Sequence, residues 1–310
     1  MKQFKDQLRG LWPAMFTPID KNGKVNVAEL EKLIELLIKE GVDGLYLLGS
    51  TGQGFLFSET ERKEIAEISL QIINKRVGTI VQVGAISTEE CIRLARHAAK
   101  AGVDAISSVG PIYYGVSGNM AFEHYSKIAR ATDLPFLPYQ IGHATNKLVV
   151  EKLMSIPNIV GMKLTTLNLL EITSVYRQTQ DKWKLFSGAD ELMCQAALCG
   201  TSGAIGSTYN LLPATFKQVR EKFLQGNVTL GNEFMLSFQN LIEDILPVIW
   251  SFYRRAMLLK HQIDIGDPKS PLLAPPLKWN DDEILQMTNS LEEITNRFAE
   301  PEIVNSNHSI

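Results

Sequence analysis

The chain has 310 residues, 45% hydrophobic and 21% charged, so it holds enough apolar material for a large core and too few charges for a disordered chain. Its 31 Lys and Arg against 34 Asp and Glu leave a formal charge of −3, which argues against nucleic acid or an anionic membrane as the main partner. The charged N-terminus lacks the apolar stretch of a signal peptide, and no run approaches the roughly 18 apolar residues of a membrane span. We therefore expect a soluble, cytoplasmic protein with no nucleic-acid or membrane partner.

The cysteines and histidines give no sign of a disulfide framework or a metal centre. Cys91, Cys194 and Cys199 form no C-x-x-C pair and are odd in number, so we expect free thiols. The five histidines are scattered along the chain and show no zinc-binding spacing. We expect neither a metal nor a cofactor.

The first clear pair of elements is a helix followed by a buried strand. Between residues 30 and 38 apolar side chains recur at helical spacing, and Asn26 can cap this helix while Gly41 can end it. The run 44–49 that follows is almost continuously apolar, as in a strand buried on both faces. A helix followed by such a strand is typical of an α/β protein.

The same order of elements recurs along the chain. Ser58 and Ser87 are each followed three residues later by a glutamate, which is the pattern of a capping box at a helix start. Related tripeptides at 41–43, 102–104 and 200–202 each end a helix and open an apolar strand. Eight candidate strands result, at residues 11–16, 44–49, 79–84, 104–109, 135–139, 158–163, 184–187 and 203–206.

Helical patterns separate these strands. Besides those that follow Asn26 and Ser58, helices are expected at residues 88–101, 121–131, 148–154, 168–176 and 191–199. Strands that alternate with helices eight times predict a closed, parallel (β/α)8 barrel of the TIM type. A doubly wound open sheet would use many of the same units, but the glycine fingerprint that binds phosphate is missing after the first strand.

After about residue 226 the strands stop and only helical patterns follow. They cover residues 230–245, 248–261 and 281–298. A proline-rich connector at 271–276 precedes the last of them. We expect residues 1–226 to form the barrel, and residues 227–310 to form a C-terminal helical extension that packs on it within the same structural unit.

Barrel enzymes carry their chemistry at the carboxyl ends of the strands, so the residues that end each apolar run are the candidates. The second strand leads into Gly49-Ser50-Thr51-Gly52, a small-residue loop whose amides and hydroxyls can hold a carboxylate or a phosphate. Loops rich in glycine and serine are also ordinary turns, so this loop decides nothing alone.

Three other strand ends carry a lysine or a tyrosine. Lys163 closes a buried apolar strand, where desolvation favours the neutral amine that attacks a carbonyl. The alternative is a solvated or salt-bridged lysine at the barrel rim. Tyr139 ends the fifth strand and Tyr113 follows the fourth, and a phenol at either place can move protons or simply pack. An anion cradle, an amine and phenols together favour chemistry at a carbonyl group.

These strand ends resemble a known family. The chain is similar to the pyruvate-dependent class I aldolases, which include N-acetylneuraminate lyase and dihydrodipicolinate synthase, at Gly49-Ser-Thr-Gly52, Tyr113, Tyr139, Gly161-Met-Lys163 and Gly203-Ala-Ile-Gly-Ser-Thr-Tyr-Asn210. The resemblance implies a barrel that assembles as a homotetramer and acts on a small 2-oxo acid.

The resemblance also implies a role for each matching residue. Lys163 would form a Schiff base with the 2-oxo acid. Tyr139 would relay protons with Thr51 and with Tyr113 from a neighbouring subunit. Ser50 and Thr51 would bind the substrate carboxylate.

Within this family the chain resembles the lyase branch more than the synthase branch. The synthases carry an arginine five positions after the strand-five tyrosine, where this chain has Ala144. Positions that bind the hydroxylated tail in sialic acid lyases are matched by Thr165, Gly188, Asp190, Glu191 and Ser207. The alternative for Asp190 and Glu191 is an acidic helix start that complements the helix dipole.

The chain departs from the family pattern at Gln53, Gln140, Gly142 and His143, and these changes bear on sugar specificity. The resemblance implies a cofactor-free lyase that cleaves N-acetylneuraminate, or a similar 2-oxo-3-deoxy sugar acid, to pyruvate and an aldehyde sugar. The close alternatives are a 2-keto-3-deoxy-gluconate-type aldolase or dehydratase and 4-hydroxy-tetrahydrodipicolinate synthase. From another class, a non-catalytic regulator that binds a sugar acid stays open.

Overall fold

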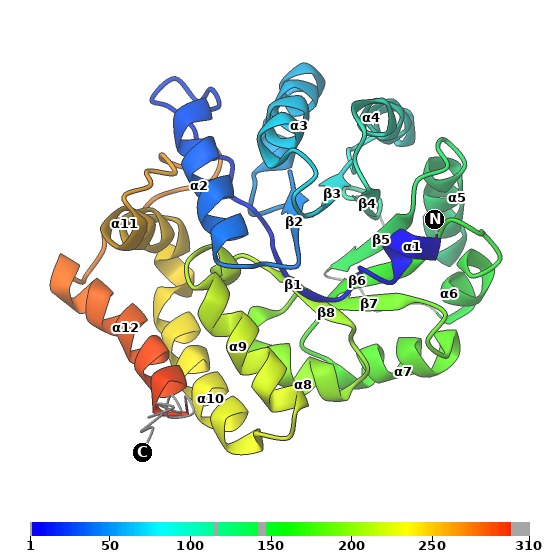
Figure 1. Cartoon of the computed structure of the whole chain (residues 1–310). Coiled ribbons are helices and arrows are strands. Elements are labelled where there is room, and N and C mark those ends of the chain that lie inside the picture. Colours follow the sequence, from blue (N-terminus) through cyan, green and yellow to red (C-terminus); the bar gives the residue numbers. More distant parts are fainter. Residues whose placement is uncertain (1, 115–116, 142–146, 299–310) are drawn as a thin grey trace, which may run out of the picture.

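The computed structural model describes residues 2–114, 117–141 and 147–298, and it contains eight parallel strands that alternate with helices (Figure 1). The strands are β1 (Gly10–Pro13), β2 (Gly44–Leu47), β3 (Gly78–Gln82), β4 (Ala105–Val109), β5 (Phe136–Ile141), β6 (Gly161–Thr165), β7 (Lys184–Ser187) and β8 (Gly203–Gly206). Neighbours in the chain are neighbours in the sheet from β2 to β8, and β8 pairs with β1. The expected (β/α)8 barrel is confirmed.

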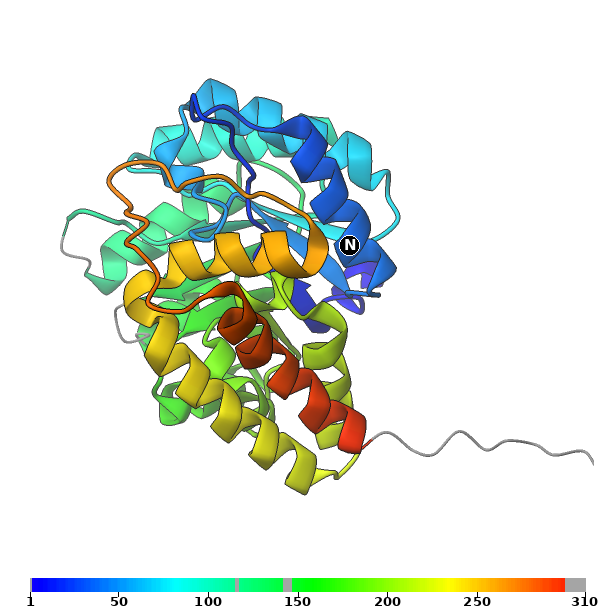
Figure 2. The same cartoon turned by 90° about the vertical axis from the view of Figure 1, so that its left-hand side faces the viewer.

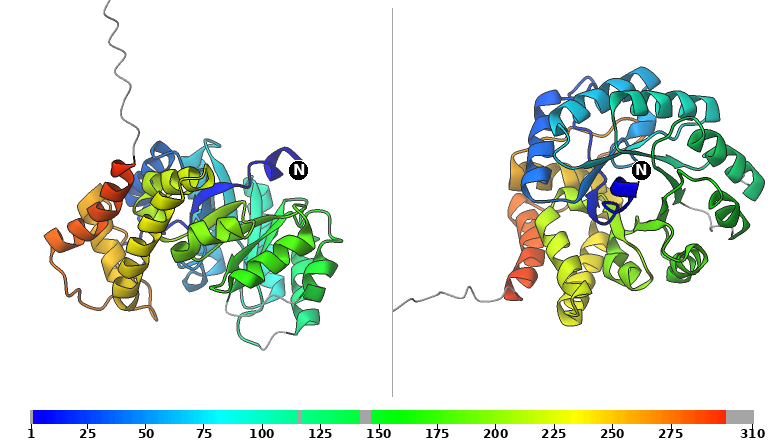
Figure 3. Two further views of the ribbon diagram at one scale, coloured as in Figure 1. Left: turned by 90° about the horizontal axis from the view of Figure 1, so that it is seen from below. Right: turned by 45° about the vertical axis from the view of Figure 1, so that its right-hand side comes forward.

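The remaining seam, between β1 and β2, is closed by two backbone hydrogen bonds. The Met15 amide donates to the Tyr46 carbonyl at 2.9 Å, and the Asp43 amide donates to the Leu11 carbonyl at 3.0 Å. The first strand was expected at 11–16 but ends at Pro13, because its last bond to β8 is the one from the Ala14 amide to the Gly206 carbonyl, and Ala14 also bridges to Tyr46 of β2. A ring of helices surrounds the strands (Figure 3).

The helices of the barrel begin and end where local signals place them. They are α2 (Val27–Lys39), α3 (Glu59–Ile73), α4 (Thr88–Ala101), α5 (Gly118–Ala129), α6 (Lys147–Leu153), α7 (Leu169–Thr179), α8 (Met193–Leu198) and α9 (Pro213–Leu224), and a short α1 (Lys2–Lys5) precedes the first strand. The Asn26 side chain caps α2, and Ser58 and Glu61 form the complete capping box of α3. The sequence did not predict α9, which has proline at its start and Leu212 at the cap position.

The C-terminal segment forms three helices, α10 (Val228–Ile245), α11 (Ile249–His261) and α12 (Asp281–Arg297), with no helix or strand in the connector 262–280. Figure 2 shows them side by side against the outside of the barrel. Phe216 of α9 meets Phe234 and Phe238 of α10 with ring centres 5.1 and 4.8 Å apart. Barrel and C-terminal residues thus share one apolar core.

A second, smaller core fills the barrel interior. It includes Trp12, Tyr46, Leu137, Phe186 and Ile205, all essentially inaccessible to solvent. These side chains come from β1, β2, β5, β7 and β8, and they fill the barrel interior below the carboxyl ends of the strands, as large residues do in barrels of this type. None of the described helices is long and apolar enough to cross a membrane.

Candidate active site

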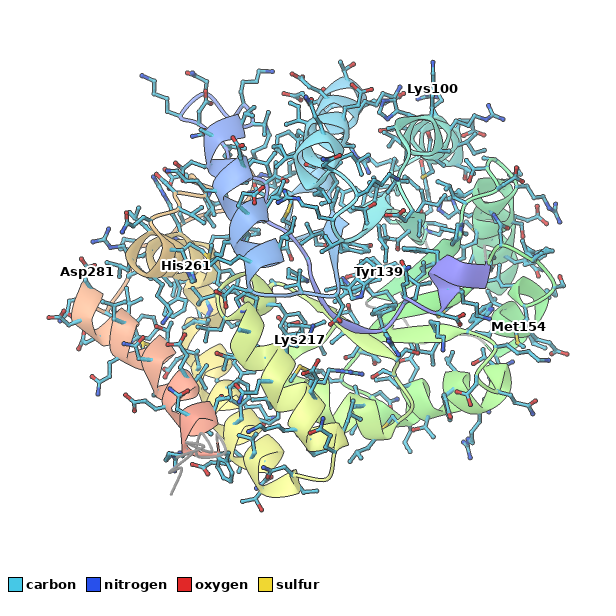
Figure 4. The ribbon with its side chains drawn as sticks, in the orientation of Figure 1. Lys100, Tyr139, Met154, Lys217, His261 and Asp281 are labelled. Atoms are coloured by element: carbon cyan, nitrogen blue, oxygen red, sulfur yellow. The ribbon has the colours of Figure 1, made fainter. Side chains whose placement is uncertain are left out.

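The barrel register brings Lys163 and Tyr139 together. The two residues are paired opposite each other on β6 and β5, so their side chains leave the sheet on the same face. Both are buried, with exposed fractions of 5% and 3%. The Lys163 Nζ atom lies 4.4 Å from the ring centre of Tyr139 and 4.7 Å from that of Tyr46. Figure 4 labels Tyr139 among the strands in the middle of the barrel.

The amine of Lys163 therefore lies between two aromatic rings. It forms no salt bridge with the residues the structure describes, and the faces of the two rings hold it in place. Tyr46 is itself fixed, because its hydroxyl donates to Ser107 Oγ at 3.1 Å. The Lys163 amine is thus held in place, and no ion pair with a described residue occupies its nitrogen. This arrangement suits attack on a carbonyl carbon.

Thr165 and Gly188 complete the surroundings of this pair. Thr165 lies two residues after Lys163 on the same face of β6, and its hydroxyl donates to the Tyr139 hydroxyl at 3.2 Å. A Cβ atom at Gly188 would lie 1.9 Å from Thr165 Oγ1 and 2.9 Å from Lys163 Cε. Glycine is therefore required at position 188, since any side chain would displace the lysine or the threonine.

Asp190 lies beyond the end of β7, at the start of a single helical turn. Its side chain is 6% exposed and accepts hydrogen bonds from the Thr208 amide at 2.8 Å and the Ser207 hydroxyl at 3.5 Å. Burial raises the pKa of Asp190 to about 6. A Cβ atom at Gly206 would lie 1.6 Å from Asp190 Oδ1, so this carboxylate lies directly over the end of β8.

Tyr253 of α11 is a site residue that sequence reasoning missed. Its hydroxyl lies 3.1 Å from Ser207 Oγ and 2.8 Å from Thr208 Oγ1, and burial raises its pKa. In the sequence it stands next to Phe252 in an apolar helical stripe and looks like a packing residue. No spacing connects it to Ser207, which is 46 residues away along the chain.

The loop after β2 provides two hydroxyls that are not committed elsewhere. Ser50 is exposed and Thr51 half-buried, and neither side chain makes a hydrogen bond to the described residues. The loop is held by a backbone hydrogen bond in which the Gly54 amide donates to the Gly49 carbonyl at 3.1 Å. It is also held by Gln53, which is buried and has a left-handed backbone conformation (φ 53°). The side-chain oxygen of Gln53 accepts a hydrogen bond from the Lys269 amide at 2.6 Å.

Other expected residues lie apart from this cluster. Tyr113 is 80% exposed, and among the aromatic rings that the structure describes it meets that of Tyr114 alone, with centres 5.2 Å apart. Glu191 is half-buried, and its backbone carbonyl accepts from the Gln239 side chain on α10 at 2.8 Å. The departures at Gly142 and His143, and Ala144 beside them, lie outside the described residues.

The expectations about metals and thiols can be compared with the described part of the chain. It holds no group of three or more His, Cys, Asp or Glu side chains arranged to bind a metal ion. The three cysteines are free: Cys91 and Cys194 are buried, and Cys199 is half-buried. The prediction of free thiols is confirmed.

The family model for the dihydrodipicolinate synthetase family matches residues 7–293. The chain belongs to this family. Among curated family members, the N-acetylneuraminate lyase of Citrobacter koseri is 30% identical over 291 residues, which are 92% of this chain and 96% of that protein. The match extends over both the barrel and the C-terminal helices.

Solved structures give the same result. The N-acetylneuraminate lyase of Fusobacterium nucleatum has a TM-score of 0.82 at 27% identity, and the match covers 95% of this chain and all of that one. A sialic acid aldolase of Ruminococcus gnavus, solved as a catalytic lysine mutant, has a TM-score of 0.89 at 22% identity and covers 95% of this chain and 99% of its own. The second likeness concerns the fold alone.

Proposed function

We propose that the protein is a Schiff-base-forming class I aldolase that cleaves N-acetylneuraminate, or a similar 2-oxo-3-deoxy sugar acid, to pyruvate and an aldehyde sugar. The observation that carries the proposal is the amine of Lys163, buried between the rings of Tyr46 and Tyr139 and free of any salt bridge to the described residues. The membership in the dihydrodipicolinate synthetase family and the 30% identity to a lyase support it.

In the proposed reaction the Lys163 nitrogen attacks the 2-oxo carbon, and loss of water leaves an imine. Tyr139 takes the proton of the C4 hydroxyl while the C3–C4 bond breaks, and the bonding electrons enter the imine to form an enamine. The hydroxylated fragment leaves as an aldehyde. Protonation of the enamine at C3 and hydrolysis by water then release pyruvate and restore the amine.

Binding of the substrate divides between two parts of the site. Ser50 and Thr51 offer uncommitted hydroxyls to the substrate carboxylate. Asp190, Glu191 and Ser207 would receive the hydroxylated tail together with Thr165 and Gly188. With a pKa of about 6, Asp190 is largely ionised at neutral pH and accepts hydrogen bonds from sugar hydroxyls.

The decisive test of the proposal is covalent trapping. Borohydride added with pyruvate should attach a reduced pyruvyl group to Lys163 and to no other lysine, as read by mass spectrometry. Lys163→Arg should lose both the adduct and all measurable turnover, because a guanidinium stays charged and cannot attack. Lys184→Arg, at the start of the neighbouring strand β7, is the matched control and should keep both.

Several outcomes would contradict the proposal. An adduct on another lysine, or none, would refute the mechanism. Pyruvate release from a panel of sugar acids then separates the substrates: cleavage of a six-carbon 2-keto-3-deoxy acid without activity on N-acetylneuraminate would assign the alternative aldolase or dehydratase. Binding of a sugar acid without turnover of any acid in the panel would favour the remaining alternative, a non-catalytic regulator.

We also propose that the protein works as a cytoplasmic homotetramer in which barrel and C-terminal helices act as one unit. The exposed Tyr113 side chain is then completed by a neighbouring subunit, where its hydroxyl joins the proton relay of Tyr139. Tyr113→Phe should lower turnover about 100-fold, the low end for an acid–base group, without changing the melting temperature. A fully active monomer in sedimentation at assay concentration would refute this assembly.

A further inference from the structure

The amino end of the barrel, opposite the candidate active site, holds two cavities that share Arg9 and Asp43. The one beside α9 has a volume of about 380 Å³ and is lined by residues that precede β1 and β8, by α9 and by Asp43 before β2. Three of its lining side chains are cationic: Arg9, Lys217 and Arg220. Figure 4 labels Lys217 on α9, near the start of β1.

Arg220 is an unusual lining residue because it is buried without a carboxylate partner. Its side chain is 6% exposed, and one terminal nitrogen donates to the carbonyls of Thr201 at 3.2 Å and Ser202 at 3.0 Å. It forms no salt bridge with the described residues, and its Nε atom is enclosed without an acceptor. A buried guanidinium left in this state is costly, because no carboxylate of the described residues pairs with it directly.

Two other lining groups lack partners in the same place. Thr201 is only 6% exposed, and its buried hydroxyl has no hydrogen-bond partner among the described residues. The Arg9 guanidinium makes no salt bridge to a described residue. Donors without a partner among the described residues therefore come from three separate segments: the exposed Arg9 before β1, the buried Thr201 before β8, and the buried Arg220 of α9.

The acidic side chains of the cavity do not supply the missing charge. Asp43 accepts from the Leu11 amide at 2.8 Å and from Lys217 at 3.3 Å, so its carboxylate is already engaged. Glu221 lies 3.9 Å from Lys217 and is more than half exposed. Three cations against two carboxylates leave one net positive charge in the lining, and neither arginine forms a salt bridge with a described residue.

We propose that this cavity binds a small dianionic oxyanion, namely phosphate or the phosphate group of a small metabolite. Two guanidinium groups and a threonine hydroxyl match the acceptors of a tetrahedral oxyanion. The bound anion would connect β1, β8 and α9 at the amino end of the barrel. It would stabilise the fold without contact with Lys163, whose neighbours lie at the other end of the strands.

The experiment is calorimetric titration of the full chain with inorganic phosphate, against chloride at equal ionic strength. Wild type should bind phosphate, and Arg9→Gln and Thr201→Val should each weaken binding at least tenfold. Arg96→Gln, an exposed arginine of α4, is the matched control and should bind as wild type. A second arm with glycerol phosphate distinguishes the free ion from a phosphorylated metabolite by which of the two binds more tightly.

Arg220→Gln should abolish binding, and its melting temperature reports whether it still folds. If that variant is unfolded, Arg9→Gln and Thr201→Val still decide the question. Absence of phosphate binding by wild type would overturn the proposal. So would equal affinity in wild type, Arg9→Gln and Thr201→Val, since the anion would then bind elsewhere.

Discussion

The two parts of the candidate site are built in different ways. Around β5 and β6, Tyr139, Lys163 and Thr165 all lie on strands and are placed by the barrel register. Around β7 and β8, Asp190 and Ser207 lie beyond the strand ends: Asp190 accepts hydrogen bonds from Ser207 and Thr208, and these two residues in turn meet Tyr253 of the C-terminal helices. The amine is thus fixed by the core of the fold, while the proposed sugar-binding part depends on loops and on α11. Substitutions in the second part can therefore change the substrate and leave imine formation intact.

The largest expected effect on activity comes from a steric clash at Gly188, which lies against Thr165 and Lys163. Gly188→Ala would place a methyl group 1.9 Å from Thr165 Oγ1 and 2.9 Å from Lys163 Cε. A displacement of about 1 Å at a reacting group costs about 100-fold in rate, so both imine trapping and pyruvate release should fall by at least that factor. Trapping at the wild-type rate would show that the lysine tolerates the methyl group and that the two parts are less tightly packed than the distances indicate.

The buried charge of the β7–β8 part gives the second effect, on stability. Because the pKa of Asp190 is raised from 3.8 to about 6, the folded protein keeps a proton that the unfolded chain has lost. The contribution of Asp190 to stability is therefore fully present below about pH 4, and about 3 kcal/mol of it is lost as pH rises through 6. Asp190→Asn lacks this decrease. Urea unfolding of both proteins from pH 4 to 7 should show the difference, and parallel curves would contradict the burial of this carboxylate.

A smaller effect on activity is expected from Tyr253, the residue that α11 contributes to the β7–β8 part of the site. Tyr253→Phe removes the hydroxyl that lies within hydrogen-bond distance of Ser207 and Thr208. One such bond contributes about 1 kcal/mol, so kcat/KM for the sugar acid should decrease about fivefold to tenfold while trapping with pyruvate is unchanged. Tyr176→Phe, a tyrosine of α7 distant from these bonds, is the control. Equal losses in cleavage and trapping would show that Tyr253 supports the whole barrel and not the sugar-binding part.

The same contrast explains what the sequence could predict. Strands buried on both faces are short apolar runs, so all eight were located, and Lys163 and Tyr139 were conspicuous because each interrupts or ends such a run. The roles of Tyr46 and Tyr253 in the candidate site were not predicted. An aromatic residue in an apolar segment gives the same sequence pattern whether it packs in the core or lines a site. Their roles depend on contacts between segments that are distant in the sequence, and local periodicity carries no information about such contacts.

The hydrogen bond from the Lys269 amide to Gln53 has a consequence for the synthesis of the protein. It joins residues 216 positions apart, so the loop that carries Ser50 and Thr51 lacks this restraint until the connector after α11 has left the ribosome. At 5–20 residues per second, that delay is about 10 to 40 s. All eight barrel strands can emerge and pack before Lys269 does, but the carboxylate cradle acquires its final shape only near the end of translation. A chain that terminates before the connector would therefore carry Lys163 and Tyr139 beside an unfinished anion site.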